Sequence, residues 1–151
     1  MPPLKATDSR LIPFPAEAIW PILADMQRYP QWWPKILFPR VTPAQEGLIG
    51  TELHLRPMGG PPITCVVRAT SVTECIELEY IGNFITGHAH WRLDPRDQGT
   101  QVSYVLDVHV HGLLGALISR FINLQPIHSF SMRNILKELE QQVKQHSAQT
   151  F

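Results

Sequence analysis

Apolar and polar residues alternate through the middle of the chain, and this period of two predicts half-buried antiparallel strands. The clearest case is 74–82, where Ile76, Leu78 and Tyr80 occupy every second position. The same alternation predicts further strands at 4–12, 47–56, 63–72, 86–94 and 100–111, with turns at 57–62 and 95–99.

The last two of these strands are expected to form a hairpin. If Leu93 pairs with Val102, Trp91 lies opposite Tyr104 and their side chains share one apolar face of the sheet. Ala89 and Leu106 pair on the same face. The opposite face then carries His88, His90, Arg92, Ser103, Asp107, His109 and His111.

Helical patterns flank the strands. Residues 15–23 and 25–29 predict two short helices, the first starting at Pro15 and the second closed by Pro30 and Pro34. Residues 113–146 predict one long helix, kinked or interrupted near its start by Pro126, with a fraying tail behind it. Its apolar stripe, spaced three or four residues apart, is Leu117, Phe121, Leu124, His128, Met132, Ile135, Leu139 and Val143.

This order of elements predicts an α+β fold. The apolar faces of the strands need one cover, and a helix of roughly 30 residues, about 45 Å long, can supply it. A sheet twisted around such a helix tends to leave an apolar cleft between the helix and the concave face.

Composition narrows the class of protein. The 151 residues fit one domain spanning 1–151, and 44% of them are hydrophobic, which excludes a disordered chain. Thirteen basic and thirteen acidic residues give no net charge, so we expect no nucleic-acid partner. No apolar run reaches the length of a membrane span and the N-terminus has no signal pattern, so the expected compartment is the cytoplasm.

Three segments then resemble a known family. PAEAIWPILADMQRYPQWWP at 15–34 is similar to the signature after the first strand of the START-like, helix-grip superfamily, and more narrowly of its polyketide cyclase/dehydrase and lipid-transport branch. HWRLDPRDQGTQVSYVLDV at 90–108 resembles the hairpin of that branch, and HSFSMRNILKELEQQV at 128–143 its closing helix. The resemblance implies a strongly curved antiparallel sheet wrapped around the C-terminal helix, with a cavity for a hydrophobic ligand between them.

One apolar surface is therefore the candidate binding site. It combines the inward strand positions with a loop tryptophan and one face of the last helix. The expected ligand-binding residues are Trp33, Leu53, Leu55, Cys65, Val67, Leu78, Tyr80, Ala89, Trp91, Tyr104, Leu106, Phe121, His128 and Met132. A filled core is the alternative interpretation for any single aliphatic member.

His128 interrupts the apolar stripe of the last helix. It is either a hydrogen-bonded core residue or a polar group facing the cleft, where it could move a proton near neutral pH. His128, Tyr104 and Tyr80 are the candidates for catalysis. No motif for nucleophilic, metal or nucleotide chemistry occurs in the sequence. No cofactor is expected. Arg133, which follows Met132 in the sequence, faces either the mouth of the cleft or solvent.

The histidines of the outer face, His88, His90, His109 and His111, lie two apart on neighbouring strands. This spacing allows a metal site, but no cysteine or fixed motif supports one, so no metal is expected. We expect the face to be solvated or buried in a homodimer. Alternation also puts Cys65 and Cys75 on opposite faces, so both should be free thiols.

The leading interpretation is binding, with transport left open, of a small hydrophobic molecule such as a lipid, a quinone or a polyketide-like ring. An enzyme of the aromatase/cyclase type, acting on a similar substrate, is the first alternative. A chaperone cofactor or protein-interaction module is the second. A dry cavity favours the carrier, converging polar groups favour the enzyme, and a collapsed interior with an exposed apolar patch favours the interaction module.

Overall fold

The computed structural model describes residues 3–121 and 123–149. A seven-stranded antiparallel sheet is its main layer, with the strands in the order β1-β7-β6-β5-β4-β3-β2. The strands are β1 (Pro3–Ile12), β2 (Arg40–Thr42), β3 (Glu52–Leu55), β4 (Ile63–Ser71), β5 (Cys75–Ile81), β6 (Ile85–Arg96) and β7 (Gly99–Val110). The helices are α1 (Ala16–Ala24), α2 (Tyr29–Trp32), α3 (Gly112–Phe121) and α4 (Leu124–Gln149).

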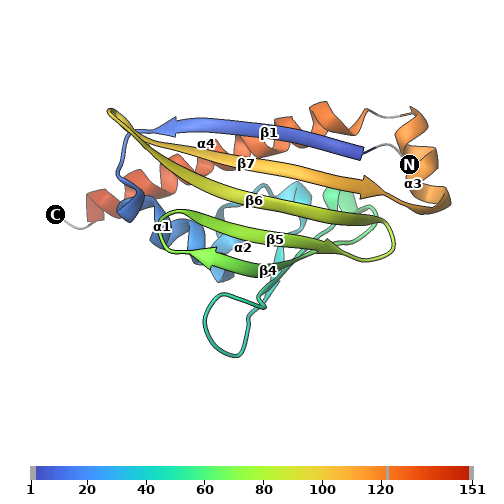
Figure 1. Cartoon of the computed structure of the whole chain (residues 1–151), viewed down its shortest axis with the longest axis horizontal. Coiled ribbons are helices and arrows are strands. Elements are labelled where there is room, and N and C mark those ends of the chain that lie inside the picture. Colours follow the sequence, from blue (N-terminus) through green and yellow to red (C-terminus); the bar gives the residue numbers. More distant parts are fainter. Residues whose placement is uncertain (1–2, 122, 150–151) are drawn as a thin grey trace.

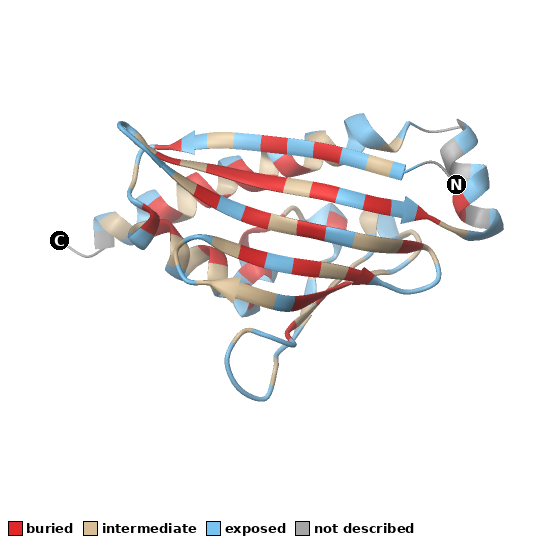
Figure 2. Cartoon of the chain, viewed as in Figure 1, coloured by how far each residue is buried: buried red, intermediate tan, exposed pale blue. Residues whose placement is uncertain are grey.

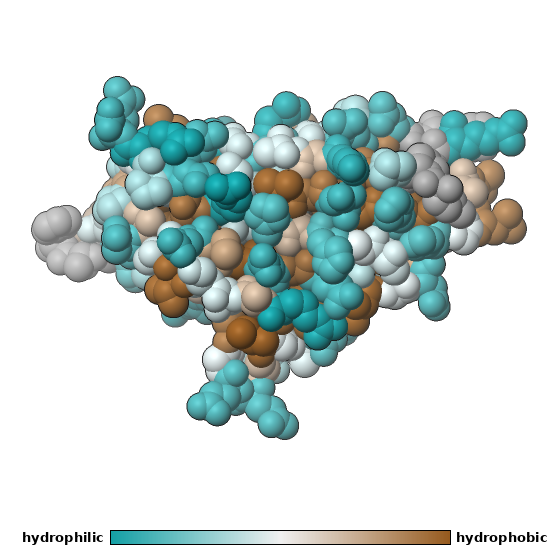
Figure 3. Space-filling model, in the orientation of Figure 1, coloured by the Kyte–Doolittle hydropathy of each residue, from teal (hydrophilic) through white to brown (hydrophobic). Residues whose placement is uncertain are grey.

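The long helix α4 lies against one face of the sheet, and the short helices α1 and α2 lie on the same side (Figure 1). Buried and exposed residues alternate along the strands, as half-buried strands require (Figure 2). Hydrophilic side chains spread across the outer face of the sheet (Figure 3). The expected α+β architecture, a curved sheet gripping a C-terminal helix, is therefore confirmed.

The predicted register of the last hairpin is confirmed. Leu93 pairs with Val102 and Trp91 with Tyr104, and the ladder continues to Ala89 and Leu106. The predicted turn at 95–99 is too long, because Arg96 still pairs with Gly99. Gly99 adopts a φ of 146°, and a Cβ there would lie 2.2 Å from the carbonyl oxygen of Ile12. Only glycine fits this close approach.

The strand predictions are less accurate between 40 and 72. Of the expected strand 47–56, only Glu52–Leu55 forms a strand, which is β3. The strand β2 was not predicted. In β4 the register shifts between Val67 and Ala69, so that Ala69 pairs with Glu77 and Thr70 pairs with the buried Ile76. Simple alternation fails at such a bulge, because one strand gains a residue that has no partner.

The predicted long helix is divided. α3 ends at Phe121 and α4 begins at Leu124, so Pro126 lies in the first turn of α4. Proline is tolerated there because the N–H groups of a first turn have no hydrogen-bond partner within the helix. The stripe does not extend into α3, since Leu117 is exposed. The tail does not fray at once, because α4 continues to Gln149.

The first helices also differ in detail from the prediction. α1 occupies the expected segment, with Pro15 just before it. The expected helix at 25–29 is instead a 3-10 turn at Met26–Arg28 followed by α2. Pro30 lies in the first turn of α2 rather than closing a helix. Among the described residues, no helix is both long and apolar enough to cross a membrane.

Candidate functional site

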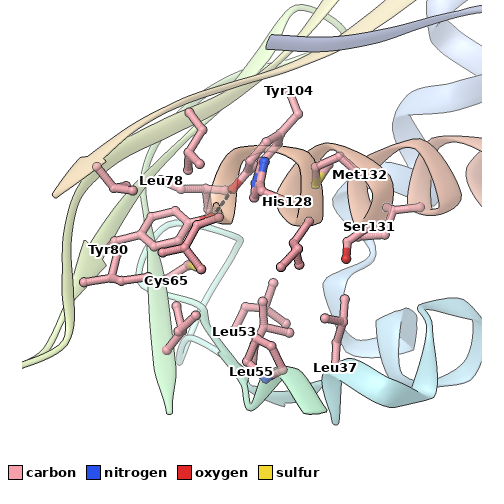
Figure 4. A pocket seen from close by; sticks show the side chains of 18 of the residues that line it. Leu37, Leu53, Leu55, Cys65, Leu78, Tyr80, Tyr104, His128, Ser131 and Met132 are labelled. Atoms are coloured by element: carbon pink, nitrogen blue, oxygen red, sulfur yellow. Dashed lines mark hydrogen bonds between the residues drawn. The ribbon is translucent and has the colours of Figure 1, made fainter. Parts of the chain in front are cut away.

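A cavity of about 320 Å³ lies between the concave face of the sheet and the N-terminal part of α4. Figure 4 shows its walls: Leu78 and Tyr80 project from β5, Leu53 and Leu55 from β3, and Met132 from α4. Most of its surface is apolar, and no Lys, Arg, Asp or Glu occurs among the described residues that line it. Such an interior suits a molecule that is largely apolar.

Most of the residues expected at the binding surface line this cavity. They are Trp33, Leu53, Leu55, Cys65, Leu78, Tyr80, Trp91, Tyr104, Leu106, His128 and Met132. Val67 and Ala89 are buried but do not line it, because they pack within the sheet and helix core instead. The side chain of Phe121 lies outside the described part of the structure.

Other lining residues were missed by the sequence analysis. Tyr29 and Leu37 come from the segment after α1, where short proline-bounded turns give no periodic signal. Ser131 and Ile127 come from α4, one position away from the predicted stripe. The face that a helix turns toward an open cavity is wider than the stripe by which a helix packs against a neighbour. A wider stripe on α4 would have included both residues.

Two tyrosine hydroxyls meet at one wall of the cavity. Tyr80 Oη and Tyr104 Oη form a hydrogen bond of 2.6 Å, marked by a dashed line in Figure 4. The thiol of Cys65 lies on the same wall as this pair (Figure 4). Burial raises the pKa of both tyrosines well above the ordinary value, and it raises the pKa of Cys65 to about 12 although the neighbouring Tyr80 hydroxyl opposes this. All three groups are therefore neutral at pH 7.

His128 lies beside this tyrosine pair, and its ring centroid is 5.9 Å from that of Tyr104. Its Nδ1 is 3.9 Å from Asp8 Oδ2, and the hydroxyl of Ser129 hydrogen-bonds with the same carboxylate oxygen at 3.2 Å. Burial lowers the pKa of His128, and the charge of Asp8 only partly opposes this, so the imidazole is neutral at pH 7.

Asp8 was not predicted as part of the site. It is 8% exposed and pairs with Tyr104 across β1 and β7. Its inward direction could have been predicted from the alternation of β1, because Asp8 follows Leu4 and Ala6 at every second position on the inner face of the strand. A carboxylate at an inward position is costly unless it has partners, so such a position marks a candidate site.

The family model described as polyketide cyclase / dehydrase and lipid transport matches residues 3–140. The chain belongs to this family. No curated protein matches the chain.

Solved structures of this family's fold are similar over nearly the whole chain. A START superfamily protein from Mycobacterium smegmatis has a TM-score of 0.69 and 17% identity, with 93% of this chain and 97% of that chain covered. The Zhui aromatase/cyclase from Streptomyces sp. R1128 has a TM-score of 0.70, 16% identity and coverage of 97% and 96%. Norcoclaurine synthase from Thalictrum flavum has a TM-score of 0.71, 11% identity and coverage of 97% of each chain. These similarities support the fold alone.

The segment after α1 carries the adjacent tryptophans Trp32 and Trp33, and one of the two is expected to pack on the end of the long helix near the cavity entrance. Trp33 lines the cavity, and its ring stacks on that of Tyr29 with 4.6 Å between the centroids. Trp32 lies instead in a groove against Gln142 and His146, at the C-terminal end of α4. The residue near the end of the helix is therefore not the one that borders the cavity.

The outer-face histidines do not form an evident metal site in the described residues, where no group of three or more His, Cys, Asp or Glu side chains is placed to hold an ion. His88 pairs with Asp107 as expected, and His111 Nε2 hydrogen-bonds with Thr86 Oγ1 at 2.5 Å. Arg133 is exposed, as in the solvent-facing alternative. Cys65 and Cys75 are both free thiols, as predicted.

Proposed function

We propose that the chain binds a small hydrophobic molecule in the cavity between its sheet and α4, and that this binding serves to carry the molecule. The observation that carries the proposal is the cavity itself: about 320 Å³ of space, walled by apolar side chains from β3, β5, β7 and α4. Empty apolar space of this size in a protein interior forgoes dispersion contacts, which a ligand would restore.

The expected energetics are those of apolar burial. A ligand that buries about 300 Å² of apolar surface gains several kcal/mol at roughly 25 cal/mol per Å², before the costs of association. Because no charged side chain lines the described cavity, affinity should increase with the apolar area of the ligand and change little with salt.

Octylbenzene is a suitable probe, because it has no polar group. We expect it to raise the melting temperature of the wild-type protein equally at low and high salt. Ser131→Trp, which fills the cavity from α4, should abolish this shift. Arg133→Trp places the same ring on the exposed side of the same helix and should retain it. If octylbenzene leaves the wild-type melting temperature unchanged, the proposal is wrong.

Cyclase-type catalysis on a polyketide-like substrate is the second candidate for the same cavity. The observation that favours it is the neutral imidazole of His128, which has Asp8 at one nitrogen and two tyrosine hydroxyls beside its ring. A cyclase would show turnover that falls in His128→Ala or Tyr104→Phe while binding is retained. A carrier would show binding and no turnover.

The interaction-module alternative receives less support. It requires a collapsed interior and an exposed apolar patch. Leu113 and Leu117 of α3 are indeed exposed, but the interior contains the cavity described above. The open interior is therefore the stronger argument for a small-molecule ligand.

A further inference from the structure

Four polar side chains of the cavity lie close together. Cys65 of β4, Tyr80 of β5, Tyr104 of β7 and His128 of α4 converge from four elements (Figure 4). Ser131 also lines the cavity but lies apart from this group in Figure 4, and Trp33 lines it with an indole N–H that has no hydrogen-bond partner among the described residues. The rest of the described lining is mostly apolar, so one end of a bound molecule would meet all the polar atoms of the group together.

The surroundings of His128 decide which ring nitrogen carries the proton. Nδ1 is fully enclosed, has no hydrogen-bond partner among the described residues, and lies 3.9 Å from the Asp8 carboxylate. The negative charge favours the tautomer with the proton on Nδ1. Nε2 then has a free lone pair. No hydrogen bond to Nε2 is found among the described residues, and the His128 side chain is 20% exposed and lines the cavity, so a molecule in the cavity can reach this nitrogen.

The tyrosine pair supplies a donor. Tyr80 and Tyr104 share one hydrogen bond and have two hydroxyl protons to place. One proton therefore stays unused. When Tyr80 donates to Tyr104, the unused proton is on Tyr104 Oη, beside the His128 ring. The cavity can thus present a donor and an acceptor next to each other.

From this arrangement we infer the chemical class of the ligand: a neutral, largely apolar molecule whose buried end bears a hydroxyl group. This rests on the proposed binding function. The hydroxyl donates to His128 Nε2 and accepts from Tyr104 Oη. A carboxylate does not fit this end, because no cation lines the described cavity and Asp8 is already negative there. An ether or a ketone would leave the acceptor on His128 unused.

Three matched probes test the class: octylbenzene, 4-octylphenol and 4-octylbenzoate, compared by calorimetry at pH 7.5, where the phenol is neutral and the benzoate is charged. We expect 4-octylphenol to bind at least about tenfold more tightly than octylbenzene, and 4-octylbenzoate more weakly than octylbenzene. Equal affinity of the phenol and octylbenzene, or tightest binding of the benzoate, would overturn the inference and leave the proposed binding function intact. Binding of none of the three would overturn both.

Two variants locate the hydroxyl. His128→Phe keeps a ring and removes the acceptor, so the advantage of 4-octylphenol over octylbenzene should fall several-fold. Ser131→Ala removes a cavity hydroxyl that lies apart from His128 and should leave that advantage unchanged. The reverse pattern would place the ligand hydroxyl at Ser131 and contradict the inference.

A measurement on the wild-type protein removes any dependence on how the variants fold. The ¹⁵N resonance of His128 Nε2 should shift when 4-octylphenol is added and stay in place with octylbenzene. No shift with a bound phenol would contradict the assigned acceptor.

Discussion

The two halves of α4 meet the same sheet in different ways. In the C-terminal half, Leu136, Leu139 and Val143 are at most 1% exposed, and Glu140 accepts hydrogen bonds from Arg10 and Lys144, both at 3.0 Å. In the N-terminal half, the corresponding face borders the cavity. One continuous helix thus forms part of a filled core along one half and the wall of a candidate binding site along the other.

The difference comes from what lies between helix and sheet. Beside the C-terminal half, α1 contributes Ile19 and Leu23, both fully buried in the core. Its Pro21 and Ile22 lie in one groove with Gln142 and His146 of α4. Beside the N-terminal half, α2 and the following turn supply Trp33 and Leu37 to the cavity wall without filling the space. The position of α1 therefore limits how far the cavity extends along α4.

The largest expected effect is on stability. Leu139→Ala in the filled half should lower the free energy of unfolding by about 2–5 kcal/mol, because it opens a new void in a closed core. Leu124→Ala in the cavity half should cost less than about 1 kcal/mol, because Leu124 is only half-buried and already borders open space. Urea unfolding measures both. Equal losses would mean that the two halves are packed alike.

Adding side-chain volume, instead of removing it, should give an intermediate loss of stability. Ala89→Trp introduces a ring where the structure has no space, so we expect a loss of roughly 1–3 kcal/mol of stability. Ser131→Trp introduces the same ring toward the cavity and should cost clearly less. A larger loss for Ser131→Trp than for Ala89→Trp would show that the cavity does not exist in solution.

The smallest effect is in the pH dependence of stability. Burial lowers the pKa of His128 in the folded protein below its unfolded value of about 6.5, so the unfolded state binds more protons. Its stabilising contribution is present above pH 6.5 and decreases as the pH falls through the folded pKa.

Between pH 7.5 and 5, His128→Phe should therefore lose less stability than the wild type. His88→Phe, at an exposed position of the outer face, provides the control and should keep the wild-type slope. An unchanged slope in His128→Phe would mean that His128 is not held neutral by burial.

Much of this fold could be predicted from the sequence, because period-two patterns are local. The Trp91–Tyr104 pairing follows from alternation together with a short turn, and it holds. The spacing of Leu139 and Val143 also identified the face of α4 that meets the sheet. The break between α3 and α4 lies before Pro126 and not at it, because proline is tolerated in the first turn of a helix.

The site was harder to predict, since periodicity gives the direction of a side chain and not the distance to the next layer. His128 and Met132 were expected to face the sheet, yet the spacing alone does not say that they border a cavity while Leu139 does not. Asp8 needed the register of β1 against β7 before its approach to His128 could be inferred.

Intermolecular nuclear Overhauser effects between octylbenzene and the methyl groups of the protein test the central claim most directly. The account predicts contacts from the probe to the methyl groups of Met132 in α4 and Leu53 in β3, and none to Leu139 or Val143. Contacts confined to the exposed side chains of α3, or no contacts with the cavity methyl groups at saturating probe, would contradict it.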